Sequence, residues 1–277
     1  MKRVILAALA GLGLSGGAAA CSMDTACTVD GRDYYVAVPD GDGPAPAVIF
    51  IHGFGGSGAG ALRNTGMVNA YLARGYAVIA PDGQPRDGAS GRRWNFHPRT
   101  MDAQTAEMDH LEAVRDDATS RLGLDPDRII LAGFSIGGSM VAYTACDRPD
   151  AFNAYAPLGG SFWRPHPSAC AGPVKMLHTH GWTDGTVPLE GRVVNQLPLS
   201  DPDAFAQGDI FVAMDVFRQA NGCDYSDPDR TAVQGDYWLR VWDQCARTSD
   251  LRLAVFARGH VIPQSWPDLV VDWFETF

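Results

Sequence analysis

One serine lies in a setting that can make its hydroxyl nucleophilic. The residues Gly133-Phe134-Ser135-Ile136-Gly137 match the pattern G-x-S-x-G, directly between the apolar run 128–132 (RIILA) and a stretch with helical periodicity. In this strand–turn–helix order the sharp turn exposes the hydroxyl, and the glycines let strand and helix approach closely. The N-terminus of the following helix also stabilises developing negative charge. We predict that Ser135 is a catalytic nucleophile.

A serine nucleophile needs a general base within hydrogen-bond reach, and the chain offers seven histidines. In open parallel sheets the chemistry lies beyond the carboxyl ends of the strands. His260 follows the last predicted strand, 251–256, and we predict that it is the base. His52 is expected to shape the turn after the first buried strand, while His178 and His180 share one face of a strand, which suits packing or metal ligation. The other histidines lie in loops or in a predicted helix: His97, His110 and His166.

The base needs an orienting acid, and in hydrolases of this architecture the acid comes between the serine and the histidine along the chain. Asp184 follows the predicted strand 174–179 and lies in a turn, where its carboxylate can accept the imidazole N–H and fix the tautomer. An Asx-turn is the ordinary alternative for such an aspartate. Asp82 and Asp224 are weaker candidates, and Asp82 precedes the serine.

The developing oxyanion needs two preorganised N–H donors. One is expected from Ile136, which follows the nucleophile, and the other from the glycine-rich turn at 52–56 (HGFGG). We predict Phe54 as the second donor, with Gly53 as the alternative.

Short apolar runs alternate with helical patterns along the chain, which predicts a mostly parallel, doubly wound α/β sheet with helices on both faces, in one domain at 21–277. The irregular segment 81–101 is too long for a simple connection and is suspected of function. The expected strands are 33–38, 47–52, 76–80, 128–132, 154–158, 174–179 and 251–256, and the expected helices are 61–73, 105–122, 136–146, 209–220 and 267–277.

The N-terminus has the pattern of an export signal. A basic start, Met1-Lys2-Arg3, precedes an apolar stretch that ends in three alanines at 18–20, so we predict a signal peptide at 1–20 and a secreted or periplasmic protein. Cys21 directly after the small residues raises lipid anchoring as an alternative. It is disfavoured because Ala18 stands where a leucine is usual.

All six cysteines follow the predicted cleavage point, and an even number in an exported chain suggests three disulfides. Fifteen pairings are possible. Sequence neighbours suggest Cys21–Cys27, Cys146–Cys170 and Cys223–Cys245. There is no C-x-x-C pair for a zinc ribbon, and we expect neither a metal nor a cofactor.

The composition disfavours several other classes of protein. The 22 Lys and Arg residues against 32 Asp and Glu residues give a net charge of −10, which repels phosphate backbones, so we expect no nucleic-acid partner. After the N-terminus no apolar run reaches the length of a membrane span.

Four features follow one another along the chain: the HGFGG turn, the DPDR sequence at 125–128 before GFSIGG, the Asp184 turn, and Cys223 and Cys245 ahead of Gly259-His260. In this order they resemble the polyhydroxybutyrate depolymerase and feruloyl esterase family. The resemblance extends over about 33–266. It implies a secreted α/β-hydrolase with Ser135, Asp184 and His260 as its triad, and a Cys223–Cys245 disulfide. Valine and isoleucine follow His260, where an aromatic residue is expected, and no separate polymer-binding domain is recognisable. The family name is therefore not taken as the substrate.

The expected partner is a small or oligomeric ester, hydrolysed through an acyl-enzyme. Trp94, Trp163 and Trp182 lie in loops on the presumed active-site side and are candidates for a substrate pocket. Two alternatives stay open. A serine peptidase would use the same triad. A dinucleotide-binding oxidoreductase would use the G-x-G-x-x-G match at 53–58.

Overall fold

The computed structural model describes residues 21–277, except 42, 98, 100, 202, 225–226 and 247–248; for 101–102 it describes only the backbone. The predicted signal peptide, 1–20, lies outside the described residues.

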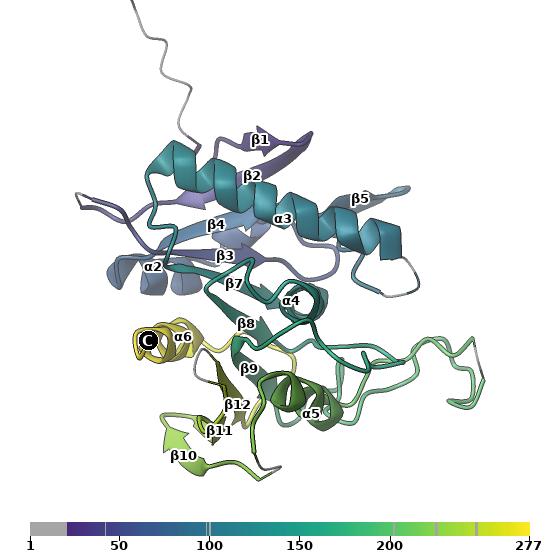
Figure 1. The fold of residues 1–277 in the computed structure, drawn as a ribbon. Helices are drawn as coiled ribbons and strands as arrows, with labels where there is room; N and C mark the ends of the chain where they lie inside the picture. The colour runs from purple at the N-terminus through teal and green to yellow at the C-terminus, as the bar shows by residue number, and fades with distance from the viewer. Residues whose placement is uncertain are drawn as a thin grey trace, which may run out of the picture.

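Within the described residues the centre of the molecule is a ten-stranded sheet, seen in Figure 1 rising from β10 at the bottom to β1 at the top. The six central strands, from β4 to β12, are parallel, and two antiparallel strands are added at each edge. In sheet order the strands are β1 (Cys27–Val29), β2 (Arg32–Ala37), β4 (Ala77–Pro81), β3 (Ala47–Ile51), β7 (Ile129–Phe134), β8 (Ala154–Leu158), β9 (Lys175–Gly181), β12 (Asp250–Phe256), β11 (Tyr237–Trp242) and β10 (Arg230–Gln234).

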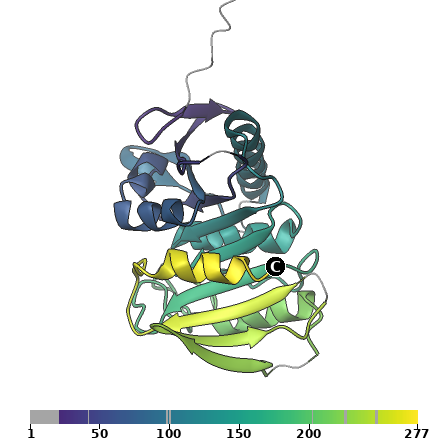
Figure 2. The same ribbon diagram turned by 90° about the vertical axis from the view of Figure 1, so that its left-hand side faces the viewer.

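Helices cover both faces of this sheet, which explains why the central strands read as continuous apolar runs. One core lies between the sheet and α3, α4 and α5, and the other between the sheet and α1, α2 and α6. Figure 2 shows α6, in yellow, lying across the second face. The helices are α1 (Gly58–Leu62), α2 (Thr65–Ala73), α3 (Met101–Leu122), α4 (Ile136–Asp147), α5 (Ile210–Ala220) and α6 (Trp266–Phe274).

The predicted fold class is confirmed, with three local differences. The expected helix at 61–73 is divided into α1 and α2, because Asn64 caps a new helix by accepting from the Met67 amide. The segment expected to be irregular contains a hairpin of β5 (Gln84–Arg86) and β6 (Ala89–Arg93). The antiparallel edge strands β1, β10 and β11 were not predicted.

The six cysteines form the disulfides Cys21–Cys27, Cys146–Cys170 and Cys223–Cys245, the pairing suggested by their order in the sequence. The second joins the end of α4 to the loop before β9, and the third joins the loop after α5 to the loop before β12. Both therefore tie down long connections between buried elements.

Removing the Cys146–Cys170 disulfide with a double Cys→Ala variant is expected to lower the free energy of unfolding by about 3 kcal/mol. The bond closes a loop with a sequence separation of 24, and its loss gives the unfolded chain more conformational freedom. Urea unfolding of the variant and the wild type measures the difference. Equal stability, with the bond shown intact in the wild type by peptide mapping, would contradict the prediction.

Candidate active site

The turn between β7 and α4 holds Ser135 in a strained backbone conformation. Its φ is 61° and its ψ −122°, in a region that a non-glycine residue adopts rarely and at a cost. The Ser135 amide donates to the carbonyl oxygen of Leu158 at 2.9 Å, and its carbonyl accepts from the Ser139 amide at 3.0 Å. The turn is thus fixed from β8 on one side and from α4 on the other.

The two glycines of the G-x-S-x-G motif allow this close approach. A Cβ at Gly133 would lie 2.6 Å from Cγ1 of Ile51 and 2.7 Å from the carbonyl oxygen of Gly137. A Cβ at Gly137 would overlap the Ile51 carbonyl oxygen and lie 2.7 Å from that of His52. Both positions therefore have no room for a side chain, which explains the motif in terms of packing.

Asp184 and His260 come from the loops after β9 and β12 and meet beside this turn. Nδ1 of His260 lies 2.7 Å from Oδ2 of Asp184, while Oδ1 of Asp184 accepts from the amides of Thr186 and Val187 at 2.8 Å each. Burial by itself would raise the pKa of Asp184, but the hydrogen bonds from His260, Val187 and Thr186 outweigh it and hold that pKa below its ordinary value. Asp184 is thus an ionised acceptor, and the aspartate end of the pair is closed to solvent, at 1% side-chain exposure.

The imidazole of His260 lies beside the turn that holds Ser135. Its ring lies on Phe134, the residue before Ser135, with 4.6 Å between ring centroids, and a Cβ at Gly159 would lie 3.4 Å from it. Because Nδ1 is engaged by Asp184, Nε2 is the nitrogen left to exchange a proton. A serine, an imidazole and a buried carboxylate in this order are the components of acyl transfer.

Two groups of amides lie beside Ser135. Ile136 begins α4, and the first amides of a helix have no acceptor within the helix. In the loop after β3 the amides of Gly55 and Gly56 donate to the carbonyls of Arg92 and Gly53. A Cβ at Gly53 would lie 3.3 Å from Cβ of Ser135, so this loop adjoins Ser135, with Gly53 and Phe54 as its remaining candidate donors.

His52 and Trp94 brace this loop. Nδ1 of His52 lies 2.8 Å from the Gly53 carbonyl oxygen, and its Nε2 accepts from the Gly83 amide at 3.1 Å. The indole of Trp94 donates to the His52 carbonyl at 3.0 Å. His52 therefore shapes the turn, as predicted.

The three candidate tryptophans for the substrate pocket lie in different environments. Trp94 is 3% exposed and supports the glycine-rich loop. Trp163 is 8% exposed and packs against Phe96 and Phe205, whereas Trp182 is 61% exposed beside Asp184. Their role in substrate binding stays a prediction, and Trp182 is the most exposed of the three.

The remaining acidic candidates lie elsewhere. Asp82 accepts from the Gly58 amide at 2.7 Å and pairs with Arg92 at 3.0 Å, and Asp224 is exposed next to Cys223. A carboxylate already at the Gly58 amide repels a phosphate there, and this argues against a dinucleotide on the 53–58 loop.

Two parts of the site were not assigned from the sequence, although the segment 81–101, which holds the first of them, was suspected of function. The β5–β6 hairpin holds the glycine-rich loop through Arg92, whose amide also donates to the Gly56 carbonyl at 2.8 Å. Gly159 and Gly160, directly after β8, leave room for His260 and for the turn at Ser135. A Gly-Gly pair at the carboxyl end of a buried strand was the available clue.

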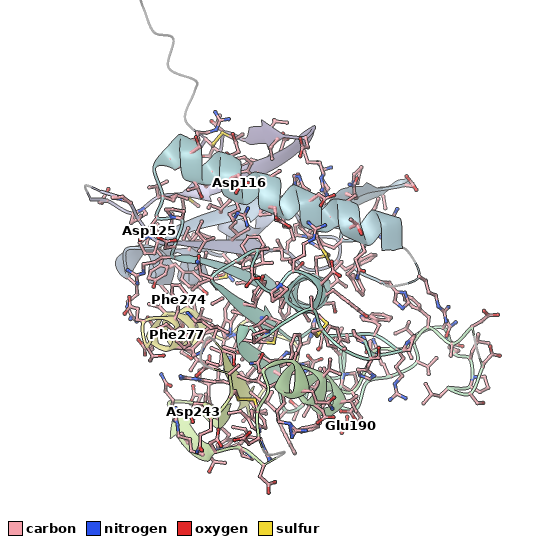
Figure 3. The ribbon with its side chains drawn as sticks, in the orientation of Figure 1. Asp116, Asp125, Glu190, Asp243, Phe274 and Phe277 are labelled. Carbon is pink, nitrogen blue, oxygen red and sulfur yellow. A yellow bond between two sulfur atoms is a disulfide. The ribbon has the colours of Figure 1, made fainter. Side chains whose placement is uncertain are left out.

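Among the described residues no group of three or more His, Cys, Asp or Glu side chains is arranged to hold a metal ion. None of the described helices is both long and apolar enough to span a bilayer. Acidic side chains such as Asp116, Glu190 and Asp243 are exposed on different sides of the molecule (Figure 3).

The chain is similar to several known proteins. Residues 46–252 match the family described as alpha/beta hydrolase fold. The chain is 31% identical over 175 residues to feruloyl esterase B of Piromyces equi, covering 58% of this chain and 30% of that protein. It is 27% identical over 176 residues to feruloyl esterase C of Emericella nidulans, covering 60% and 59%. The chain thus spans less than two thirds of either relative.

Among solved structures, an acetyl xylan esterase from Aspergillus awamori superimposes with a TM-score of 0.63 at 18% identity, over 89% of this chain and 94% of that one. At this identity the likeness concerns the fold.

Proposed function

Because the chain belongs to the alpha/beta hydrolase fold family, we propose that it is a serine esterase that hydrolyses carboxylic esters through Ser135, His260 and Asp184. The observation that carries this proposal is the Asp184–His260 hydrogen bond of 2.7 Å beside a serine held at positive φ. The relatives named feruloyl esterase support ester hydrolysis as the reaction.

In the first step Ser135 Oγ attacks the ester carbonyl while Nε2 of His260 takes the hydroxyl proton. The oxyanion accepts hydrogen bonds from the amides of Ile136 and Phe54, and His260 then gives its proton to the leaving alcohol. In the second step water gives a proton to His260 and attacks the acyl-enzyme, which releases the acid and restores Ser135. Asp184 stays ionised throughout and stabilises the imidazolium.

For the substrate we propose a small or oligomeric ester of the feruloyl, acetyl or hydroxybutyrate type. The names of the relatives and the resemblance of the motifs support this range. For the location we propose export, since three disulfides fit an oxidising compartment.

The proposed function is tested by treating the folded protein with a fluorophosphonate and locating the adduct by peptide mass spectrometry, with hydrolysis of 4-nitrophenyl acetate followed in parallel. We expect one adduct, on Ser135, and loss of hydrolysis in proportion to labelling. Folded protein that hydrolyses no ester and leaves Ser135 unmodified would refute the proposal.

A further inference from the structure

Two buried histidines lie behind Asp184 and form a hydrogen-bond chain that ends at the Val187 carbonyl. His178 and His180 lie on one face of β9 with nearly parallel rings, 5° apart, and Nε2 of His178 is 3.2 Å from Nδ1 of His180. Nε2 of His180 is 2.8 Å from the Val187 carbonyl oxygen and 3.6 Å from Oδ2 of Asp184. The side chains of His180 and Asp184 are at most 1% exposed, so bulk water does not compete for these contacts.

The acceptor at the end of this chain fixes the protons on both rings. The Val187 carbonyl can only accept, so Nε2 of His180 carries a hydrogen. In neutral His180 the bare Nδ1 then accepts from the Nε2–H of His178. Burial lowers the pKa of His180. Burial and the neighbouring His180 together lower the pKa of His178, so both rings are stable in their neutral state.

Val187 connects this chain to the catalytic aspartate. Its amide donates to Oδ1 of Asp184, while its carbonyl accepts from His180. His180 therefore fixes the turn whose amides bind Oδ1 of Asp184. Its N–H also lies on the side of Oδ2, the carboxylate oxygen that binds His260.

We propose that His180 is a positioning residue for Asp184, with His178 fixing the tautomer of His180. This inference rests on the proposed function, because Asp184 matters only if it orients His260. It assigns a catalytic consequence to a histidine pair whose spacing by itself suits packing or metal ligation.

The arrangement also has an electrostatic consequence. At 3.6 Å the His180 N–H is beyond hydrogen-bond distance from Oδ2, but its positive end stabilises negative charge there. The titratable groups facing His180 are His178 on the same strand, Asp184 in the following loop and His260 in the loop after β12.

The test compares wild type, His180→Leu and His180→Gln in the hydrolysis of 4-nitrophenyl acetate at neutral pH. Leucine removes the donor, and we expect kcat to fall about 10- to 100-fold with KM little changed, as for a catalytic group displaced by a fraction of an ångström. Glutamine carries an amide near the position of Nε2 and should recover most of the loss.

A second measurement asks whether His180 acts through Asp184. In the Asp184→Asn background His180→Leu should cost almost nothing further, because residues that act as one unit are not additive. A full additional loss of kcat there would overturn the inference, and so would wild-type kcat in His180→Leu.

These outcomes are distinguishable from failure of the proposed function. If the wild type hydrolyses the ester and is labelled on Ser135 while the variants behave like it, only the role of His180 fails. If the wild type shows neither, both proposals fail. Should His180→Leu not fold, His180→Asn replaces it: its amide is too short to reach the Val187 carbonyl, and wild-type kinetics in this variant overturn the inference equally.

Discussion

Replacing Asp184 by asparagine is expected to lower kcat for ester hydrolysis by roughly four orders of magnitude. The two carboxylate oxygens of Asp184 have different partners, and these partners determine the orientation of the asparagine side-chain amide. Oδ1 accepts from the Thr186 and Val187 amides, so the carbonyl oxygen of an asparagine has to take that place. Its NH₂ group then faces His260, where the wild type has an acceptor.

This reversal changes the tautomer of the base. Facing a donor, Nδ1 of His260 becomes the acceptor, and its hydrogen moves to Nε2. A protonated Nε2 cannot take the proton of Ser135. The loss should therefore appear in kcat, with the fold retained.

Asp209→Asn is the matched control, because Asp209 likewise accepts from two backbone amides, those of Phe211 and Val212, at the N-terminus of α5. Asparagine is equally suited to such a cap, so this variant should keep wild-type kcat. Steady-state kinetics with 4-nitrophenyl acetate and circular dichroism provide the comparison. An Asp184→Asn enzyme within tenfold of the wild type would contradict the proposed triad.

The same substitution has a signature in the stability of the fold at low pH. The folded-state pKa of Asp184 lies below its ordinary value of about 3.9, so its ionised form contributes stability that is present above that pH. This contribution is lost as the pH falls through the folded pKa. The difference in urea unfolding between wild type and Asp184→Asn should accordingly shrink in acid.

The central strands were predictable because burial on both faces leaves a direct trace in the sequence. The runs AVIFI of β3 and AYAPL of β8 are fully buried, and each was predicted within one residue of its observed bounds. The edge strands leave no such trace. In β10 four of the five residues are exposed, and its pairing depends on β11, which the local pattern does not reveal.

The candidate site likewise has parts that could be predicted from the sequence and parts that could not. Ser135 and the glycines around it are packed by neighbours in the sequence, so the motif could be recognised from one segment. The meeting of Asp184 with His260 depends on two strand ends that are adjacent only in the sheet. Strand order could suggest this, but the further link from His180 through Val187 depends on the path of a turn, which residue types alone do not specify.

Replacing Gly160 by alanine is expected to disable the site from a residue that takes no part in the chemistry. A Cβ there would overlap the carbonyl oxygen of Ser135 and lie 2.9 Å from the Ser139 amide nitrogen, the two groups whose hydrogen bond begins α4. Both are backbone atoms in a turn already at positive φ, so neither can move without moving Ser135. We expect kcat to fall at least about 100-fold, as for a reacting group displaced by about an ångström.

The same overlap should lower the free energy of unfolding by about 1–3 kcal/mol, since backbone must shift to admit the methyl group. Gly66→Ala is the matched control: this exposed glycine in α2 has only Oδ1 of Asn64 near its would-be Cβ, at 3.8 Å, and should keep wild-type activity and stability or gain slightly in stability. Kinetics and urea unfolding of both variants decide the matter. If Gly160→Ala retains wild-type kcat, the turn at Ser135 has freedom that its hydrogen bonds to Leu158 and Ser139 exclude, and the tight coupling of β8 to the nucleophile would have to be abandoned.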